Sequence, residues 1–125
     1  MSTRRAVQFL VSVFLIYAQG AASANCESSI TTRDILICFQ AELAAKDSEI
    51  ERLRAQLRSV LSSEEKILYE QSELAWASFQ LANCNAARSI FADGTMASVV
   101  FAQCKLEMTT QRIVDLQKTY AIRLE

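Results

Sequence analysis

Four cysteines are the residues of this chain best suited to chemistry: Cys26, Cys38, Cys84 and Cys104. An even number of cysteines in a small exported chain indicates a framework of structural disulfides, and four cysteines allow three pairings. Redox-catalytic sites usually show a Cys-x-x-Cys spacing, and none of the four has it. We therefore expect disulfides that staple the fold.

Few other residues could carry out catalysis. The chain has no histidine, which removes the commonest general base and metal ligand. With the thiols bridged, the remaining nucleophiles are serine and threonine hydroxyls without an evident activating base. The paired carboxylates Glu64-Glu65 are explained by the first turn of a helix, where the dipole favours negative charge. No glycine-rich phosphate loop or metal-ligand spacing occurs, so we expect no enzyme, metal or cofactor.

The first 24 residues have the layout of a secretory signal peptide. Arg4 and Arg5 precede an apolar run over residues 6–18, and Ala22-Ser23-Ala24 supplies a small-residue cleavage site. The run is shorter than the roughly 20 apolar residues that span a bilayer. We predict a signal peptide at 1–24 and one helical domain at 25–125, which leaves no stable membrane span after cleavage.

Two alternatives to cleavage remain open. One is a retained membrane anchor, and the other is lipid attachment at Cys26, which would call for a small residue where Asn25 stands. Cleavage would remove Arg4 and Arg5 and leave 11 basic residues against 14 acidic ones, a net charge of −3. Because nucleic-acid binding needs a dense basic face, we expect no nucleic-acid partner.

The elements that must hold the cysteines are helices, because proline is absent and Gly20 and Gly94 are the only glycines. A first helix should begin after Thr31, with Asp34 completing an approximate capping box. Its apolar stripe is heptad-like and is interrupted only at Lys46. That stripe comprises Leu36, Phe39, Leu43, Ile50, Leu53, Leu57 and Val60, and the outer, solvated face carries Glu42, Asp47, Glu49, Glu51, Arg52, Arg54 and Arg58.

Two further helices follow. Ser62 and Glu65 form a second capping box, and Gly94 marks the next break. We expect the second helix to pack through Ile67, Leu68, Leu74, Ala75, Phe79, Ala82 and Ile90, with a largely buried Trp76 covering a seam. The third should run from about Thr95 to the C-terminus and pack through Val99, Ala102, Leu106, Thr109, Ile113, Leu116 and Tyr120. The predicted fold is all-α, a three-helix up-down-up antiparallel bundle with long helices, disulfide-stapled at one end.

The hairpin geometry favours one cysteine pairing. Cys84 lies ten residues before Gly94 and Cys104 ten after it, so the two come level in an antiparallel hairpin. Cys26 would then pair with Cys38. A bridge between Cys38 and Cys84 stays open, because those positions share one end of the bundle.

Two segments resemble the LprI-type lysozyme inhibitor domain. The upstream one contains Cys26, Cys38 and Ala44-Ala45-Lys46-Asp47-Ser48-Glu49-Ile50. The downstream one contains Leu74-Ala75-Trp76-Ala77-Ser78-Phe79, Cys84, Gly94-Thr95, Cys104, Leu106, Thr109, Arg112 and Leu116. The likeness spans nearly all of the chain after the leader. The chain departs from the family pattern at Glu51, Arg54, Gln80 and Asp93.

The resemblance implies a bacterial exported helical protein, periplasmic or secreted, whose partner is a protein such as a lysozyme-type muramidase. The matching residues Trp76, Phe79, Thr109 and Arg112 are structural candidates. A recognition tip is a hypothesis for residues 89–95, where Phe91 would be an apolar anchor and Asp93 an acceptor for a basic cleft.

The tip hypothesis rests on Phe91, Asp93, Gly94 and Thr95, held between Cys84 and Cys104. A plainer alternative is that Ile90 and Phe91 cap the end of the bundle. A second hypothesis for the whole protein is a structural or envelope-stress role, in which it self-associates through the first-helix seam near Lys46 or binds envelope components.

Overall fold

The computed structural model describes residues 26–29, 31–92 and 94–125, so the predicted leader lies outside the described residues. A short 3-10 helix, η1 (Cys26–Ser28), precedes α1 (Thr32–Val60), α2 (Ser63–Ser89), α3 (Thr95–Thr119) and the short α4 (Ala121–Leu124). No strand occurs in these ranges, which confirms the all-helical class. Within them, no helix is both long and apolar enough to cross a membrane.

The helix starts lie where the capping residues predict them. The Thr31 hydroxyl accepts a hydrogen bond from the Asp34 amide at 3.1 Å and donates one to the Asp34 carboxylate at 2.6 Å. Before α2, the Ser62 amide donates to the Glu65 carboxylate at 2.8 Å and the Ser62 hydroxyl accepts from the Glu65 amide at 3.3 Å. Both arrangements satisfy amide groups that a helix start leaves without intrahelical partners.

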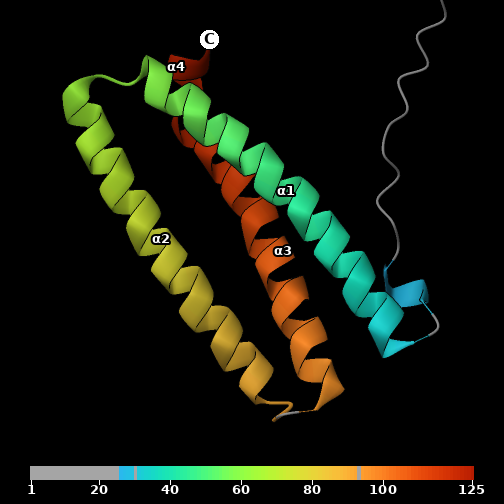
Figure 1. Ribbon diagram of the computed structural model, residues 1–125. Helices are drawn as coiled ribbons and strands as arrows, with labels where there is room; N and C mark the ends of the chain where they lie inside the picture. The colour runs from blue at the N-terminus through green and yellow to red at the C-terminus, as the bar shows by residue number, and fades with distance from the viewer. Residues whose placement is uncertain (1–25, 30, 93) are drawn as a thin grey trace, which may run out of the picture.

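The third long helix, α3, packs against both of the other long helices. Figure 1 shows the chain reversing after α1 and again after α2, and α3 makes the main contacts with both earlier helices. One buried cluster lies where α1 ends and α3 ends, and consists of Ile50, Leu53, Leu57, Leu61, Tyr69, Ile113 and Leu116. A second lies near the start of α1 and of α3, and consists of Cys26, Phe39, Val99 and Ala102.

The apolar seam of α1 therefore packs inside the molecule, against α3. Lys46, which interrupts it, donates to Glu49 at 2.7 Å on the same helix. Val60, expected in the stripe, is exposed, because the stripe ends one residue later at buried Leu61. The hypothesis of self-association requires this seam to be exposed, but on α1 it packs against α3.

The prediction for α2 is wrong about which face is buried. Tyr69, Glu73, Gln80 and Cys84 face the other helices, and Trp76 is half-buried rather than largely buried. The residues expected to pack, namely Ile67, Leu68, Leu74, Ala75, Phe79, Ala82 and Ile90, are exposed. The buried stripe has helical spacing, and its members Glu73 and Gln80 find hydrogen-bond partners on other helices, which offsets the cost of burying them.

Candidate functional site

The site hypothesis concerns the end of the hairpin that α2 and α3 form. A disulfide joins Cys84 to Cys104, with their Cα atoms 5.6 Å apart, which is the pairing that the hairpin geometry favours. Beyond this bridge the chain turns within residues 90–94. The Phe91 amide donates to the Arg88 carbonyl and the Gly94 amide to the Phe91 carbonyl, each at 3.1 Å. The turn is held by backbone hydrogen bonds and by a covalent link below it.

The tight turn requires unusual backbone geometry at two positions. Ala92 has a φ of 49°, in the left-handed region that residues with a Cβ atom rarely occupy. Gly94 is the N-cap of α3, and a Cβ atom there would lie 3.1 Å from the Phe91 carbonyl oxygen. A side chain at position 94 would therefore crowd the turn.

The predicted tip residues lie at this turn where the structure describes them. Phe91, Gly94 and Thr95 are exposed, and Asp93 lies outside the described residues. The neighbouring Ile90 is 80% exposed. Such exposure argues against the simpler view in which Ile90 caps the end of the bundle, and it adds a second apolar side chain to the tip.

A hollow of about 610 Å³ opens beside the turn, between the end of α2 and the start of α3. The Arg88 guanidinium reaches this hollow and lies 5.2 Å from the centre of the Phe101 ring. The remaining lining is small and uncharged: Asn85, Ser89, Ala92, Gly94, Ala97 and Ser98. The hollow could accept a partner's side chain without burying a cluster of charges.

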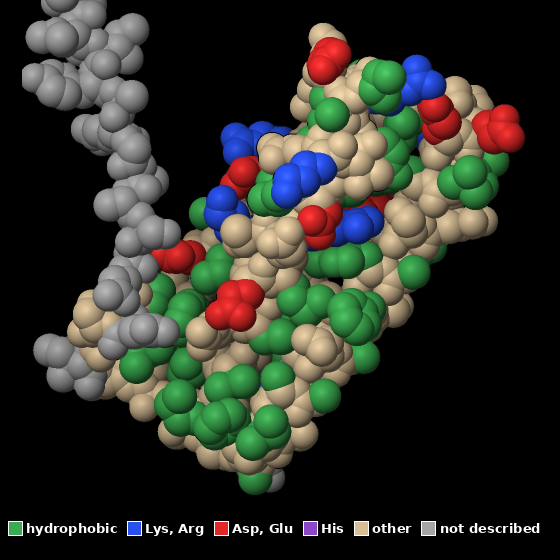
Figure 2. All heavy atoms as spheres, turned by 180° about the vertical axis from the view of Figure 1, so that it is seen from behind, with side chains coloured by type: hydrophobic (Ala, Val, Ile, Leu, Met, Phe, Trp, Pro, Cys, Tyr) green, Lys and Arg blue, Asp and Glu red, His purple; other side chains and the backbone are tan. Residues whose placement is uncertain are grey.

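The parts of α2 and α3 next to the tip are poor in charge, and Arg33 of α1 lies beside Thr95. Between Leu74 and Cys104 the sequence has only two ionisable side chains outside the disulfide, Arg88 and Asp93. Figure 2 shows hydrophobic side chains gathered over the half of the visible face nearest the α2–α3 turn, while most charged side chains gather over the other half. On this face of the molecule, the α2–α3 turn lies in the apolar half.

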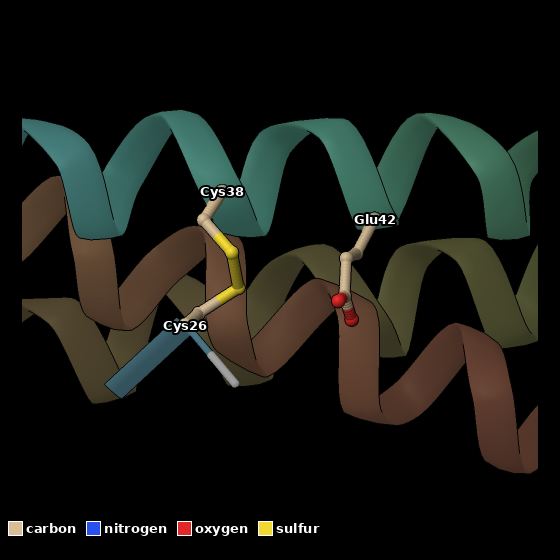
Figure 3. Close-up of side chains that lie close together, drawn as sticks. All are labelled: Cys26, Cys38 and Glu42. Atoms are coloured by element: carbon tan, nitrogen blue, oxygen red, sulfur yellow. A yellow bond between two sulfur atoms is a disulfide. The ribbon is translucent and has the colours of Figure 1, made fainter. Parts of the chain in front are cut away.

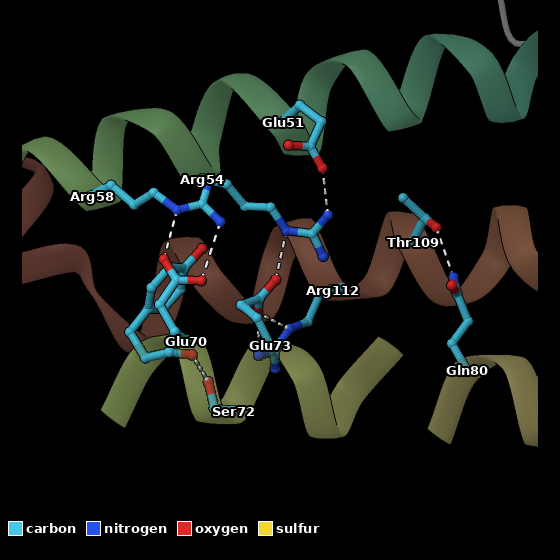
Figure 4. A network of polar contacts seen from close by, with 10 residues as sticks. Glu51, Arg54, Arg58, Glu70, Ser72, Glu73, Gln80, Thr109 and Arg112 are labelled. Carbon is cyan, nitrogen blue, oxygen red and sulfur yellow. Dashed lines mark hydrogen bonds and ion pairs between the residues drawn. The ribbon is translucent and has the colours of Figure 1, made fainter. Parts of the chain in front are cut away.

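A polar network joins all three long helices at the middle of the molecule (Figure 4). The Glu73 carboxylate on α2 accepts from Arg54 Nε of α1 at 2.5 Å and from Arg112 Nη2 of α3 at 2.6 Å. Arg54 also donates to Glu51 at 2.7 Å. Both guanidinium groups lie 5.6 Å from the centre of the Trp76 ring. Arg54, expected on the solvated face of α1, is mostly buried instead.

The carboxylates of this network favour the charged form of Arg54. Burial would lower the pKa of Arg54, but its hydrogen bonds to Glu51 and Glu73 outweigh that effect and raise the pKa. Tyr69 lies one turn before Glu73, and burial, with a smaller contribution from Glu73, raises the pKa of its hydroxyl to about 12. The hydroxyl has no hydrogen-bond partner within the described ranges.

A second polar contact lies closer to the disulfide. The Gln80 side-chain amide donates to Thr109 Oγ1 at 2.9 Å and to the Lys105 carbonyl at 3.3 Å. Thr109 and Arg112, which match the family pattern, thus tie α3 to α2. Phe79, the other motif residue on α2, is exposed.

Sequence reasoning missed the inward role of Arg54, Glu73 and Gln80. A usable signal was present: Tyr69, Glu73, Trp76, Gln80 and Cys84 recur at spacings of three and four. Arg54 and Gln80 are also two of the positions that depart from the family pattern.

One group of described side chains has the spacing of a metal site, but a disulfide prevents two of them from binding a metal. Figure 3 shows Cys26, Cys38 and Glu42 close together, with their ligand atoms within 4.8 Å of one another. The two sulfurs are bonded to each other, and the Cα atoms lie 5.5 Å apart, as the favoured pairing requires. Thiolates bind metals, so a disulfide leaves only the Glu42 carboxylate as a ligand here.

Comparison with known proteins supplies one match. The family model described as lysozyme inhibitor LprI matches residues 22–116. No curated protein and no solved structure matches the chain. The match covers both disulfides, the three-helix network and the hairpin tip. The chain belongs to the LprI lysozyme inhibitor family.

Proposed function

We propose that this protein is an exported inhibitor of lysozyme-type muramidases that binds its target through the hairpin tip. Membership of a lysozyme inhibitor family supports the target class and a binding role without catalysis. In this proposal residues 1–24 are removed on export and residues 25–125 form the working domain, in the periplasm or outside the cell.

The choice of surface is based on the exposed apolar turn, which lies in a loop closed by a disulfide. Ile90 and Phe91 are exposed, and they lie in the stretch of chain that the Cys84–Cys104 bridge closes into a loop. A bridge that fixes a loop before binding lowers the conformational entropy that binding must remove. Central apolar anchors beside a hollow are the usual source of affinity in protein interfaces, so Ile90, Phe91 and the hollow form a plausible contact unit.

The test is a titration of the purified, oxidised protein into a muramidase activity assay. We expect inhibition that saturates near one inhibitor per enzyme. Ile90→Glu should weaken it by about tenfold or more, because the charge would have to be desolvated at the contact. Ile122→Glu is the matched control, since Ile122 is 84% exposed on α4, which follows α3 at its far end.

Two results would contradict the proposal. Absence of inhibition at a tenfold molar excess would remove the muramidase as target. Equal inhibition by Ile90→Glu and Ile122→Glu would keep the target but move the contact away from the tip. Circular dichroism of each variant checks that the helices are retained.

A further inference from the structure

The outer face of α2 is apolar, and within the described part of the chain nothing covers it. Five large side chains on this helix are 53–71% exposed: Ile67, Leu68, Leu74, Phe79 and Leu81. Their inward counterparts are the partly polar stripe through Glu73 and Gln80. α2 thus has its polarity reversed relative to an ordinary surface helix, which presents its apolar stripe to the core.

The area of this face is large for a monomer. At about 200 Å² for a residue of this size, the five residues present roughly 600 Å² of apolar surface, at the upper end of the largest patches on typical monomers. Ile67, Leu74 and Leu81 lie along one line of the helix and present roughly 370 Å² of it, whereas Leu68 and Phe79 lie to one side of that line. Two such lines pressed together would bury roughly 750 Å² from these side chains, to which the polar seam residues add, as expected of a weak, reversible interface. Smaller neighbours on the face, such as Ala75 and Ala82, would add to this area.

The sequence along the face has the spacing of a helix-pairing seam. Ile67, Gln71, Leu74, Ser78, Leu81 and Asn85 follow one another at alternating intervals of four and three residues. None of the six carries a charge, so a copy of the same face would meet no like charge. This self-compatibility points to a second copy rather than to a charged partner.

We propose that the protein forms a symmetric dimer in which the outer faces of two α2 helices pack antiparallel. In this register Ile67 lies against Asn85 of the partner subunit, Gln71 against Leu81 of the partner subunit, and Leu74 against Ser78 of the partner subunit. Each large residue faces a small or polar one, which lets the side chains interdigitate. Residues 90–95 of the tip and Leu81 of the seam do not overlap, and Asn85, which lines the hollow, is the residue that the seam shares with the proposed muramidase contact.

Sedimentation of the oxidised protein over a range of concentrations tests the proposal. We expect a reversible monomer–dimer equilibrium. Leu81→Glu should raise the dimer dissociation constant by about tenfold or more, because it sets a charge into the seam without its counter-ion. Ile122→Glu should leave the dissociation constant unchanged, since Ile122 lies on α4.

A charge pair tests the antiparallel register. Combining Gln71→Lys with Leu81→Glu places opposite charges against each other across an antiparallel seam, so dimerisation should return, whereas a parallel seam would set like charges together. A protein that is monomeric at all concentrations, or a Leu81→Glu variant that dimerises like wild type, would overturn the proposal.

Muramidase inhibition provides an independent readout. Leu81→Glu should inhibit as wild type does, because Leu81 and the tip do not overlap. A monomeric wild type whose inhibition is lost on Leu81→Glu would overturn the dimer and assign the α2 face to the enzyme instead. Loss of the inhibitor role alone would leave the sedimentation result standing.

Discussion

At the scale of single residues, Glu73 is the side chain on which most contacts converge. It lies on the middle helix of the sequence and bonds guanidinium groups from both others, Arg54 and Arg112. Its side chain is only 8% exposed. Buried ion pairs add little net stability over apolar packing, yet breaking one leaves a charge without its partner. We therefore expect the loss of this carboxylate charge to destabilise the junction of the three helices.

Glu73→Gln tests this role. The amide keeps the shape but removes the negative charge between two cations, so we expect the free energy of unfolding to fall by about 3 kcal/mol. Chemical denaturation followed by circular dichroism measures it. Glu70→Gln is the matched control: Glu70 pairs with Arg58 at the surface, where ion pairs contribute little. Equal denaturation midpoints for the two variants would show that the network is not a structural centre.

At the scale of elements, the sequence predicts starts and breaks better than buried faces. Thr31, Ser62 and Gly94 mark helix boundaries correctly, because capping and turning are local events. The seams of α1 and α3 follow from apolar spacing. The face of α2 does not, since Glu73 and Gln80 are buried by partners on other helices that no local pattern reveals.

The candidate site shows the same division. The hairpin turn and the Cys84–Cys104 pairing follow from distances along the chain about Gly94. The exposure of Ile90 and the hollow at Arg88 do not, because both depend on how the end of α2 and the start of α3 pack against each other. That packing is set by side-chain volumes across the interface, which residue spacing does not specify.

The hairpin bridge gives a prediction at this scale. Replacing Cys84 and Cys104 together by alanine should lower the free energy of unfolding by about 3 kcal/mol in the chain-entropy account. Muramidase inhibition should fall as well, because the tip would have to be ordered on binding. The control replaces Cys26 and Cys38, whose bridge lies at η1 and α1, away from the turn. If only the control lost inhibition, the tip would be the wrong surface.

At the scale of the whole molecule, the interhelical ion pairs and the disulfides lie in different parts of its length. Ion pairs join the helices at the middle and far end, including Arg58 with Glu70 and Arg123 with Glu65. The disulfides and the exposed turn occupy the other end.

Export is also a prediction about the whole molecule. We predict that the native protein begins at Asn25 and carries two disulfides, since the leader layout and the bridges both suit an oxidising compartment. Intact mass measurement before and after reduction with alkylation checks both statements. An N-terminus at Met1 together with four free thiols would contradict export.

Trp76 is the only tryptophan of the chain, and two guanidinium groups of the three-helix network lie 5.6 Å from the centre of its ring. Its indole fluorescence is therefore a built-in optical gauge of whether α1, α2 and α3 are in contact. Any event that loosens one helix, whether heat, a mutation or a docked enzyme, would change the emission of a single identified fluorophore without any label.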